Sequence, residues 1–155
     1  MLSGRDLMKL ASLFQIEMDV DGYERFDIGG VPTIVHVPWR GEKNIGHWVA
    51  VFTNNQGNNY FDSYGGYPDE LIVEKNTNDY DPRLSKWLLS NKEDIIYNDH
   101  NFQKNGNSCG VWSFIRILFK DLTDEQFEDA FKEFTSDELT DLLIEMTKKK
   151  LNEIN

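Results

Sequence analysis

Residues 103–119 read QKNGNSCGVWSFIRILF, a polar turn followed by a largely apolar run. The run from Cys109 to Phe119 is apolar on most sides and contains no Gly or Pro after Gly110, which predicts a buried helix. The turn at 105–108 would precede it. Cys109 therefore falls in the first turn of the predicted helix, where the helix dipole and free backbone N–H groups favour a thiolate over a thiol.

Upstream of this helix, two strand-like runs, 47–53 and 59–63, are joined by the polar stretch 54–58 and predict a β-hairpin. His47 and Asp62 lie near the open end of this hairpin, where side chains on paired strands can meet. A cysteine nucleophile needs a His as proton donor and a third group that fixes the His tautomer. The hairpin thus supplies candidates for both, although the sequence alone does not place them near Cys109.

The other segments also carry signals of regular structure. A capping box formed by Ser3 and Asp6 predicts a helix that extends to about Gln15. The remaining expected elements are strands at 31–37 and 95–98, turns at 27–30 and 41–44, a short helix capped by Asp81-Pro82, and two final helices capped by Thr123 and Ser136.

The composition is that of one packed domain, and we expect a single domain over residues 1–155. The chain contains no apolar run of membrane-spanning length and no secretory signal, so we expect a soluble, intracellular protein. The only cysteine cannot form an internal disulfide, and the three histidines lack metal-ligand spacing. We therefore expect no metal and no cofactor.

The net charge is −11, and residues 121–155 contribute −7 of it, from eleven Asp/Glu and four Lys. Such a charge repels phosphate backbones and anionic lipid, which makes DNA and membranes unfavourable partners. It is compatible with simple solubility or with attraction of a basic partner.

Three segments together resemble the adenain-like and ubiquitin-like-protease superfamily of cysteine proteases: GHWVAV at 46–51, YFDSYG at 60–65 and QKNGNSCG at 103–110. The order and the spacing both match, with fifteen residues from His47 to Asp62 and six from Gln103 to Cys109. The acid-bearing segment is closest in appearance to that of maturation proteases of large DNA viruses and virus-like transposons. The resemblance covers residues 46–119, nearly half of the chain.

The resemblance implies a role for each matching residue. Cys109 would be the nucleophile, His47 the general base and acid, and Asp62 its orienting carboxylate. Gln103 would donate its amide to the oxyanion, beside the backbone N–H of Cys109. The resemblance further implies that Trp48 and Gly110 bind substrate, Trp48 as a wall of a narrow channel and Gly110 by letting the substrate backbone come close.

The fold that the resemblance implies is α+β, papain-like or adenain-like. It has a mixed central sheet flanked by helices and the nucleophile at the N-terminus of a buried helix. The implied function is an endopeptidase that cleaves a protein or polyprotein after small residues, at Gly-X-Gly or Gly-Gly sites, in viral maturation. We expect a monomer in the host cytoplasm, the nucleus or the virion. A basic peptide activator is compatible with the acidic C-terminal helices.

Other functions stay open at this point. A deconjugating isopeptidase acting on SUMO or ubiquitin-like proteins is the main alternative. An acetyltransferase would need a basic coenzyme pocket that this acidic chain does not offer, and a catalytically inactive binding module would not need all four matching residues. Taken singly, Cys109 and Trp48 could be core residues, His47 a sheet residue and Asp62 a turn-former. His36 and His100 are expected to be structural, although His100 could line the cleft near Gln103.

Overall fold

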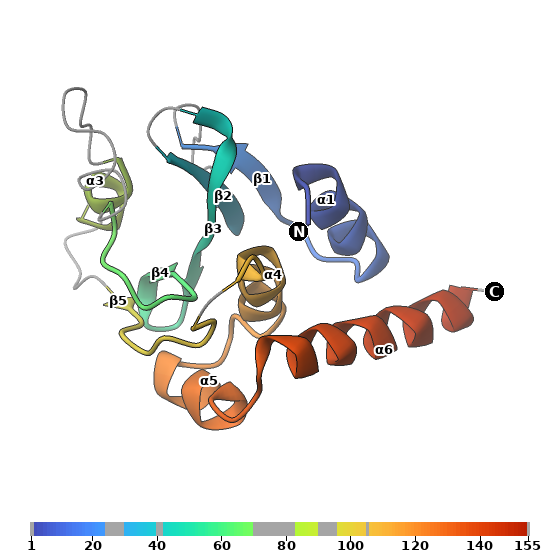
Figure 1. The fold of residues 1–155 in the computed structure, drawn as a ribbon. Coiled ribbons are helices and arrows are strands. Elements are labelled where there is room, and N and C mark those ends of the chain that lie inside the picture. Colours follow the sequence, from blue (N-terminus) through green and yellow to red (C-terminus); the bar gives the residue numbers. More distant parts are fainter. Residues whose placement is uncertain are drawn as a thin grey trace.

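The computed structural model describes residues 2–23, 30–39, 42–69, 83–89, 96–104 and 106–154. Its centre is a five-stranded mixed sheet in the spatial order β1-β2-β3-β4-β5 (Figure 1). The strands are β1 (Asp19–Gly22), β2 (Thr33–Trp39), β3 (Glu42–Asn54), β4 (Gly57–Phe61) and β5 (Ile96–Tyr97). The outer pairs β1/β2 and β4/β5 are parallel, whereas β2/β3 and β3/β4 are antiparallel. The expected α+β class with a mixed sheet is confirmed.

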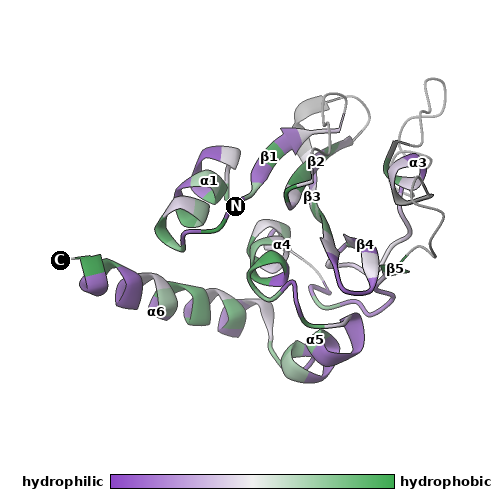
Figure 2. Ribbon diagram, turned by 180° about the vertical axis from the view of Figure 1, so that it is seen from behind, coloured by the Kyte–Doolittle hydropathy of each residue, from purple (hydrophilic) through white to green (hydrophobic). Residues whose placement is uncertain are grey.

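The helices of the described residues are α1 (Gly4–Leu13), α3 (Arg83–Leu89), α4 (Cys109–Leu118), α5 (Asp124–Phe131) and α6 (Ser136–Ile154). The expected buried helix is confirmed as α4, in which every residue from Cys109 to Ile117 is buried. Figure 2 shows hydrophobic residues along α4, whereas α6 carries hydrophobic and hydrophilic residues along its length.

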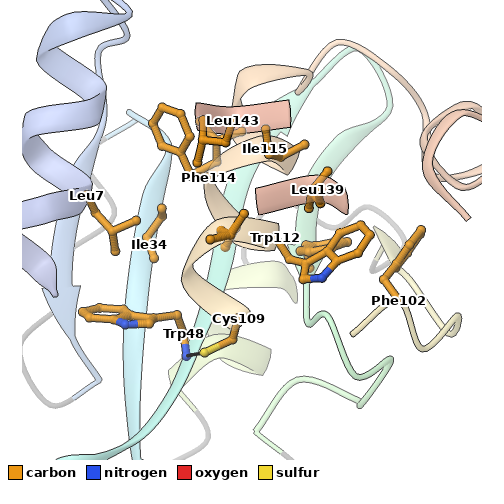
Figure 3. Packing of buried hydrophobic residues seen from close by; sticks show 14 of the residues in the cluster. Leu7, Ile34, Trp48, Phe102, Cys109, Trp112, Phe114, Ile115, Leu139 and Leu143 are labelled. Atoms are coloured by element: carbon orange, nitrogen blue, oxygen red, sulfur yellow. Dashed lines mark hydrogen bonds between the residues drawn. The ribbon is translucent and has the colours of Figure 1, made fainter. Parts of the chain in front are cut away.

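Alternation along β3 divides the core between the two faces of the sheet. Trp48, Ala50 and Phe52 pack with α1, α4, α5 and α6, and Figure 3 shows part of this cluster around Trp112. Val49 and Val51 point to the other face, where they pack with strand residues and Leu84 of α3. The sheet is therefore covered on both faces, and α4 lies on the face with the larger hydrophobic cluster.

Side-chain caps fix the starts of three helices. Ser3 and Asp6 form the expected capping box of α1, and Thr123 and Gln126 form that of α5. The cap expected at Ser136 is wrong by one residue, because the Thr135 hydroxyl accepts from the Glu138 N–H and the Glu138 side chain returns to the Thr135 N–H.

Several boundaries differ from expectation. Strand β1 was not anticipated, because Asp19-Val20-Asp21-Gly22 has little strand character and forms by pairing with β2. Residues 42–44 belong to β3 instead of the turn expected at 41–44. Strand β4 occupies 57–61 instead of 59–63, so Asp62 follows the strand. The hairpin itself is confirmed, with Asn54 pairing with Gly57 at its tip.

A buried carboxylate supports the start of α3 from a distance. Asp69 is 2 % exposed and accepts hydrogen bonds from the N–H groups of Leu84 and Ser85 and from the Tyr23 hydroxyl. The N-cap expected at Asp81-Pro82, Ile95 of the strand expected at 95–98 and most of the turn expected at 27–30 lie outside the described residues.

Candidate active site

The thiol of Cys109 stands at the first residue of α4. Ser108 is the N-cap but makes no side-chain capping bond, and Gly106, with φ of +87°, turns the preceding loop. The Sγ atom accepts a hydrogen bond from the Trp48 N–H at 3.4 Å, drawn as a dashed line in Figure 3. The side chain thus faces β3, and only 2 % of Cys109 is exposed.

His47 and Asp62 lie just beyond the paired parts of β3 and β4. The two strands pair from Asn54 and Gly57 as far as Ala50 and Phe61, and the pairing ends there. Just beyond this point, His47 Nε2 lies 2.6 Å from Asp62 Oδ1, and both side chains are nearly fully buried. The expected meeting of the two residues at the open end of the hairpin is therefore found.

The Cys109 side chain also raises the pKa of the His47 imidazole, through hydrogen bonding and charge, which indicates that the thiol and the ring lie close together. Because Nε2 is engaged by Asp62, the other ring nitrogen, Nδ1, is the one available to the thiol. The structure thus brings Asp62, His47 and Cys109 close together, with a hydrogen bond between Asp62 and His47, although they come from three segments distant in sequence.

These contacts shift the pKa values of both partners in the direction of an ion pair. Burial lowers the pKa of His47, but its hydrogen bonds to Asp62 and Cys109 and the charges on both raise it overall to about 9. Burial raises the pKa of the Cys109 thiol, but hydrogen bonding to His47, the charge on His47 and the N–H groups of Trp48 and Gly110 together lower it. The site favours a thiolate beside an imidazolium.

A buried asparagine holds Asp62 in place. Asn98 Nδ2 donates to the Asp62 carbonyl at 2.7 Å, and Asn98 Oδ1 accepts from the Asp62 N–H at 3.0 Å. The Tyr64 N–H adds a bond to Asp62 Oδ1 at 2.9 Å. Sequence reasoning placed Asn98 only at the end of a strand and missed this contact, since the spacing between residues 62 and 98 matches no local motif.

Gln103 lies in the loop ahead of α4. Its Oε1 accepts from the Ser63 hydroxyl at 2.6 Å, and its Nε2 donates to the Gly106 carbonyl at 2.9 Å. Each bond engages one end of the amide, so the side chain is fixed in orientation. One hydrogen on Nε2 is left for a further acceptor.

Trp48 and Gly110 lie side by side and are covered by residues from the start of the chain. The Trp48 indole N–H donates to the Leu2 carbonyl at 3.2 Å. A Cβ placed on Gly110 would lie 3.3 Å from Leu2 Cβ and 3.4 Å from Trp48 Cδ1. The missing Cβ of Gly110 thus makes room for Leu2 and Trp48, and its expected role in binding substrate stays a prediction.

The ring of Tyr64 lies against the imidazole of His47, with centroids 4.9 Å apart and an interplanar angle of 30°. An aromatic face near an imidazolium is an attractive arrangement. Burial, followed by the charges on Cys109 and Asp62, raises the pKa of the Tyr64 hydroxyl, which donates to the Gly106 carbonyl at 2.9 Å. Tyr64 was part of the resembling segment but was assigned no role from sequence.

The other two histidines have partners outside the Cys109 series. The His36 ring packs edge-on against Trp48 at 4.9 Å. His100 Nδ1 lies 3.1 Å from Glu128 Oε1 on α5, and its ring contacts Phe102. His36 thus makes a ring contact, and His100 makes a ring contact and a polar contact to a carboxylate; their structural role stays a prediction.

Within the described ranges, no cluster of three or more His, Cys, Asp or Glu side chains could hold a metal ion. The helices in these ranges also include none with the length and apolar character needed to cross a membrane.

Comparisons with known proteins point to viruses. No family model matches the chain. An uncharacterized protein of the Sputnik virophage is 36% identical over 100 residues, which are 58% of this chain and 57% of that protein. A protein of Acanthamoeba polyphaga mimivirus named "Putative thiol protease" is 34% identical over 90 residues, which are 54% of this chain and 27% of that protein. The matches therefore span between about a quarter and somewhat over half of these relatives.

Proposed function

We propose that this chain is a cysteine peptidase with Cys109 as nucleophile, His47 as general acid and base, and Asp62 as the carboxylate that orients His47. The observation that carries the proposal is that the His47 ring bonds Asp62 Oδ1 and lies close enough to the Cys109 thiol for each of the two to shift the pKa of the other. The name of the mimivirus relative supports the same chemistry. The finer assignment to an adenain-like protease rests on the resembling segments.

In the proposed reaction, the Cys109 thiolate attacks the scissile carbonyl carbon, and a new C–S bond forms as the carbonyl oxygen takes up negative charge. The backbone N–H of Cys109 and the remaining hydrogen on Gln103 Nε2 would stabilise this oxyanion. The C–N bond then breaks, and the imidazolium of His47 gives its proton to the leaving amine.

The resulting thioester is hydrolysed by water. Neutral His47 accepts a proton from the attacking water, the C–S bond breaks, and the product acid leaves while the thiolate and imidazolium are restored. Asp62, held by Asn98 and the Tyr64 N–H, keeps the His47 ring in the orientation needed for both steps.

We further propose that the substrate is a protein or polyprotein cleaved after small residues, of the Gly-X-Gly or Gly-Gly type, during viral maturation. The packing of Leu2 and Trp48 around Gly110 supports small residues, because it leaves little free space beside the residue that follows the nucleophile. The two viral relatives support the context.

A peptide library cleaved by the wild type and by Cys109→Ser tests the activity. The wild type should cut after small residues, and Cys109→Ser should lose nearly all cleavage. His47→Ala should lose it as well, whereas the matched variant His100→Ala should retain it, because His100 contacts Glu128 and Phe102 instead of the thiol. Equal cleavage by wild type and Cys109→Ser would refute a cysteine peptidase.

A second assay distinguishes a maturation endopeptidase from a deconjugating isopeptidase. It compares turnover of fluorogenic SUMO and ubiquitin conjugates with turnover of short Gly-Gly peptides. Turnover of the peptides supports the endopeptidase. Efficient turnover of the conjugates alone would contradict it and favour the isopeptidase.

A further inference from the structure

Beyond the end of the β3/β4 pairing, side chains of α4 bond the backbone of β3 at Trp48. Residues of like parity on an antiparallel strand point their N–H and C=O groups to the same side. Trp48 shares its parity with Ala50 and Phe52, whose partners on β4 are Phe61 and Asn59. The N–H and C=O groups of Trp48 therefore point toward the β4 side of β3. The pairing with β4 ends at Ala50, so β4 does not pair with Trp48.

Two side chains of α4 make hydrogen bonds to the backbone groups of Trp48 that β4 does not reach. Cys109 Sγ accepts from the Trp48 N–H at 3.4 Å, and the Ser113 hydroxyl donates to the Trp48 carbonyl at 3.2 Å. Residues four apart lie on one face of a helix, so both bonds come from the same side of α4. Ser113 is 0 % exposed, so the Trp48 carbonyl would have no water to replace the hydroxyl.

We infer that Ser113 is a positioning residue for the nucleophile, fixing the first turn of α4 against Trp48 so that the Cys109 thiol meets the Trp48 N–H and His47. The inference deepens the proposed function, because it concerns the same thiol. It requires only an activated thiol, however, and not peptide cleavage.

The stabilisation of the thiolate depends on distances that Ser113 sets. The His47 hydrogen bond and the Trp48 N–H both lower the pKa of Cys109, and both act over a short range. Among the described residues, the other titratable groups near the thiol are Asp62, bonded to His47, and Tyr64, whose pKa the charge on Cys109 helps to raise after burial. Burial and then the charge on His47 lower the pKa of His36 on β2. A change at position 113 alters none of these groups chemically, so its effect must come through the placement of α4.

The experiment measures the rate of Cys109 alkylation by iodoacetamide as a function of pH, in the full chain. For Ser113→Ala we expect alkylation near pH 6 to slow by about threefold or more, while the rates converge above about pH 9, where both thiols are ionised. Thr147→Ala is the control, because it removes a hydroxyl-to-carbonyl bond of the same kind within α6, to Leu143, and should keep the wild-type profile.

The pair Ser113→Thr and Ser113→Val covers the case in which the alanine variant does not fold. Threonine and valine have nearly the same shape, so both should disturb the packing around position 113 to a similar extent. Only threonine keeps a hydroxyl donor. Threonine should stay closer to the wild-type profile and valine should be shifted to higher pH. Identical alkylation profiles for Ser113→Thr and Ser113→Val, or an unchanged profile for a folded Ser113→Ala, would overturn the inference. A wild-type protein that cleaves no peptide would contradict the proposed function but not this inference.

Discussion

At the level of single residues, the chemistry of the site follows from burying His47 between two groups that favour its charged form. Burial opposes the imidazolium, yet Asp62 and Cys109 outweigh it and raise the pKa of His47 to about 9. Because the same contacts lower the pKa of Cys109, the two residues share one proton in a buried pair. Removal of either partner therefore affects both.

His47→Ala should raise the pKa of Cys109 relative to the wild type, because burial is then opposed only by the N–H groups of Trp48 and Gly110. We expect alkylation of Cys109 near pH 7 to slow by about tenfold or more. A stopped-time alkylation series over pH measures this, with His100→Ala as the matched control. A profile identical to that of the wild type would mean that His47 does not activate the thiol.

In the wild type, the pH profile of peptidase activity should have a plateau with an alkaline limb near the pKa of His47, about 9. Below this value His47 carries the proton that the leaving amine needs, and raising the pH through it removes that proton. The acidic limb should lie below the ordinary thiol range, because the pKa of Cys109 is lowered. An activity that keeps rising past pH 9, as for an isolated thiol, would contradict the ion pair.

At the level of elements, Asp69 shows how a cap can come from a distant segment. Its carboxylate receives the free N–H groups at the start of α3 and the hydroxyl of Tyr23, and it is buried. The acceptor for these N–H groups is thus a buried carboxylate from a distant segment, whereas a side-chain cap usually comes from the residue just before the helix.

Asp69→Ala should lower the free energy of unfolding by about 2–3 kcal/mol, since three donors lose their acceptor inside the fold. Urea denaturation measures the loss. Asp121→Ala, at an exposed carboxylate, should change stability by less than about 0.5 kcal/mol. Alkylation of Cys109 should be unaffected, because α3 packs on the opposite face of the sheet from α4. A stable Asp69→Ala protein would show that these bonds contribute little.

Local patterns predicted the elements whose causes are local. The helix at Cys109, the hairpin around its Asn-rich tip and the boxes at Ser3 and Thr123 follow from periodicity and capping chemistry. Strand β1 and the cap at Asp69 were missed, because each depends on a partner more than ten residues away. The start of β4 at Gly57 was also missed, since the polar residues Asn58 and Asn59 are buried there with side-chain partners that no pattern reveals.

The candidate site shows the same division. The resembling segments predicted His47, Asp62 and Cys109, and the structure brings these three together. Asn98 and Ser113, which hold Asp62 and α4 in place, were not found from sequence. An asparagine at a strand end and a serine in an apolar helix are both common, and only the fold shows what they contact.

At the level of the whole molecule, one buried cation joins the sheet to the C-terminal helices. The Arg116 guanidinium is 0 % exposed and lies 4.7 Å from the Phe52 ring centroid and 4.9 Å from that of Phe127. It donates to the carbonyls of Phe119 and Leu122 and to Asp124. Arg116 thereby links the end of α4, the turn after it and the start of α5.

Arg116→Ala should lower the free energy of unfolding by about 3–5 kcal/mol, because it leaves two carbonyls and a partly buried carboxylate without their donor. Arg116→Met should lose less, because the longer side chain still fills the space between the two aromatic rings. Urea denaturation of both variants measures the difference. Equal stability of Arg116→Ala and the wild type would mean that the guanidinium contributes no net stability.

The contact between Leu2 and Trp48 has a practical consequence for work with this protein. An affinity tag or fusion partner joined at the amino end would emerge beside the residues that flank Cys109, and could displace the Leu2 carbonyl from the indole. The last turns of α6 extend away from the sheet, and Ile154 is 69 % exposed (Figure 1). A carboxyl-terminal tag is therefore the safer choice for every assay above, and moving the tag between the two ends gives a direct measure of how strongly the amino end influences the thiol.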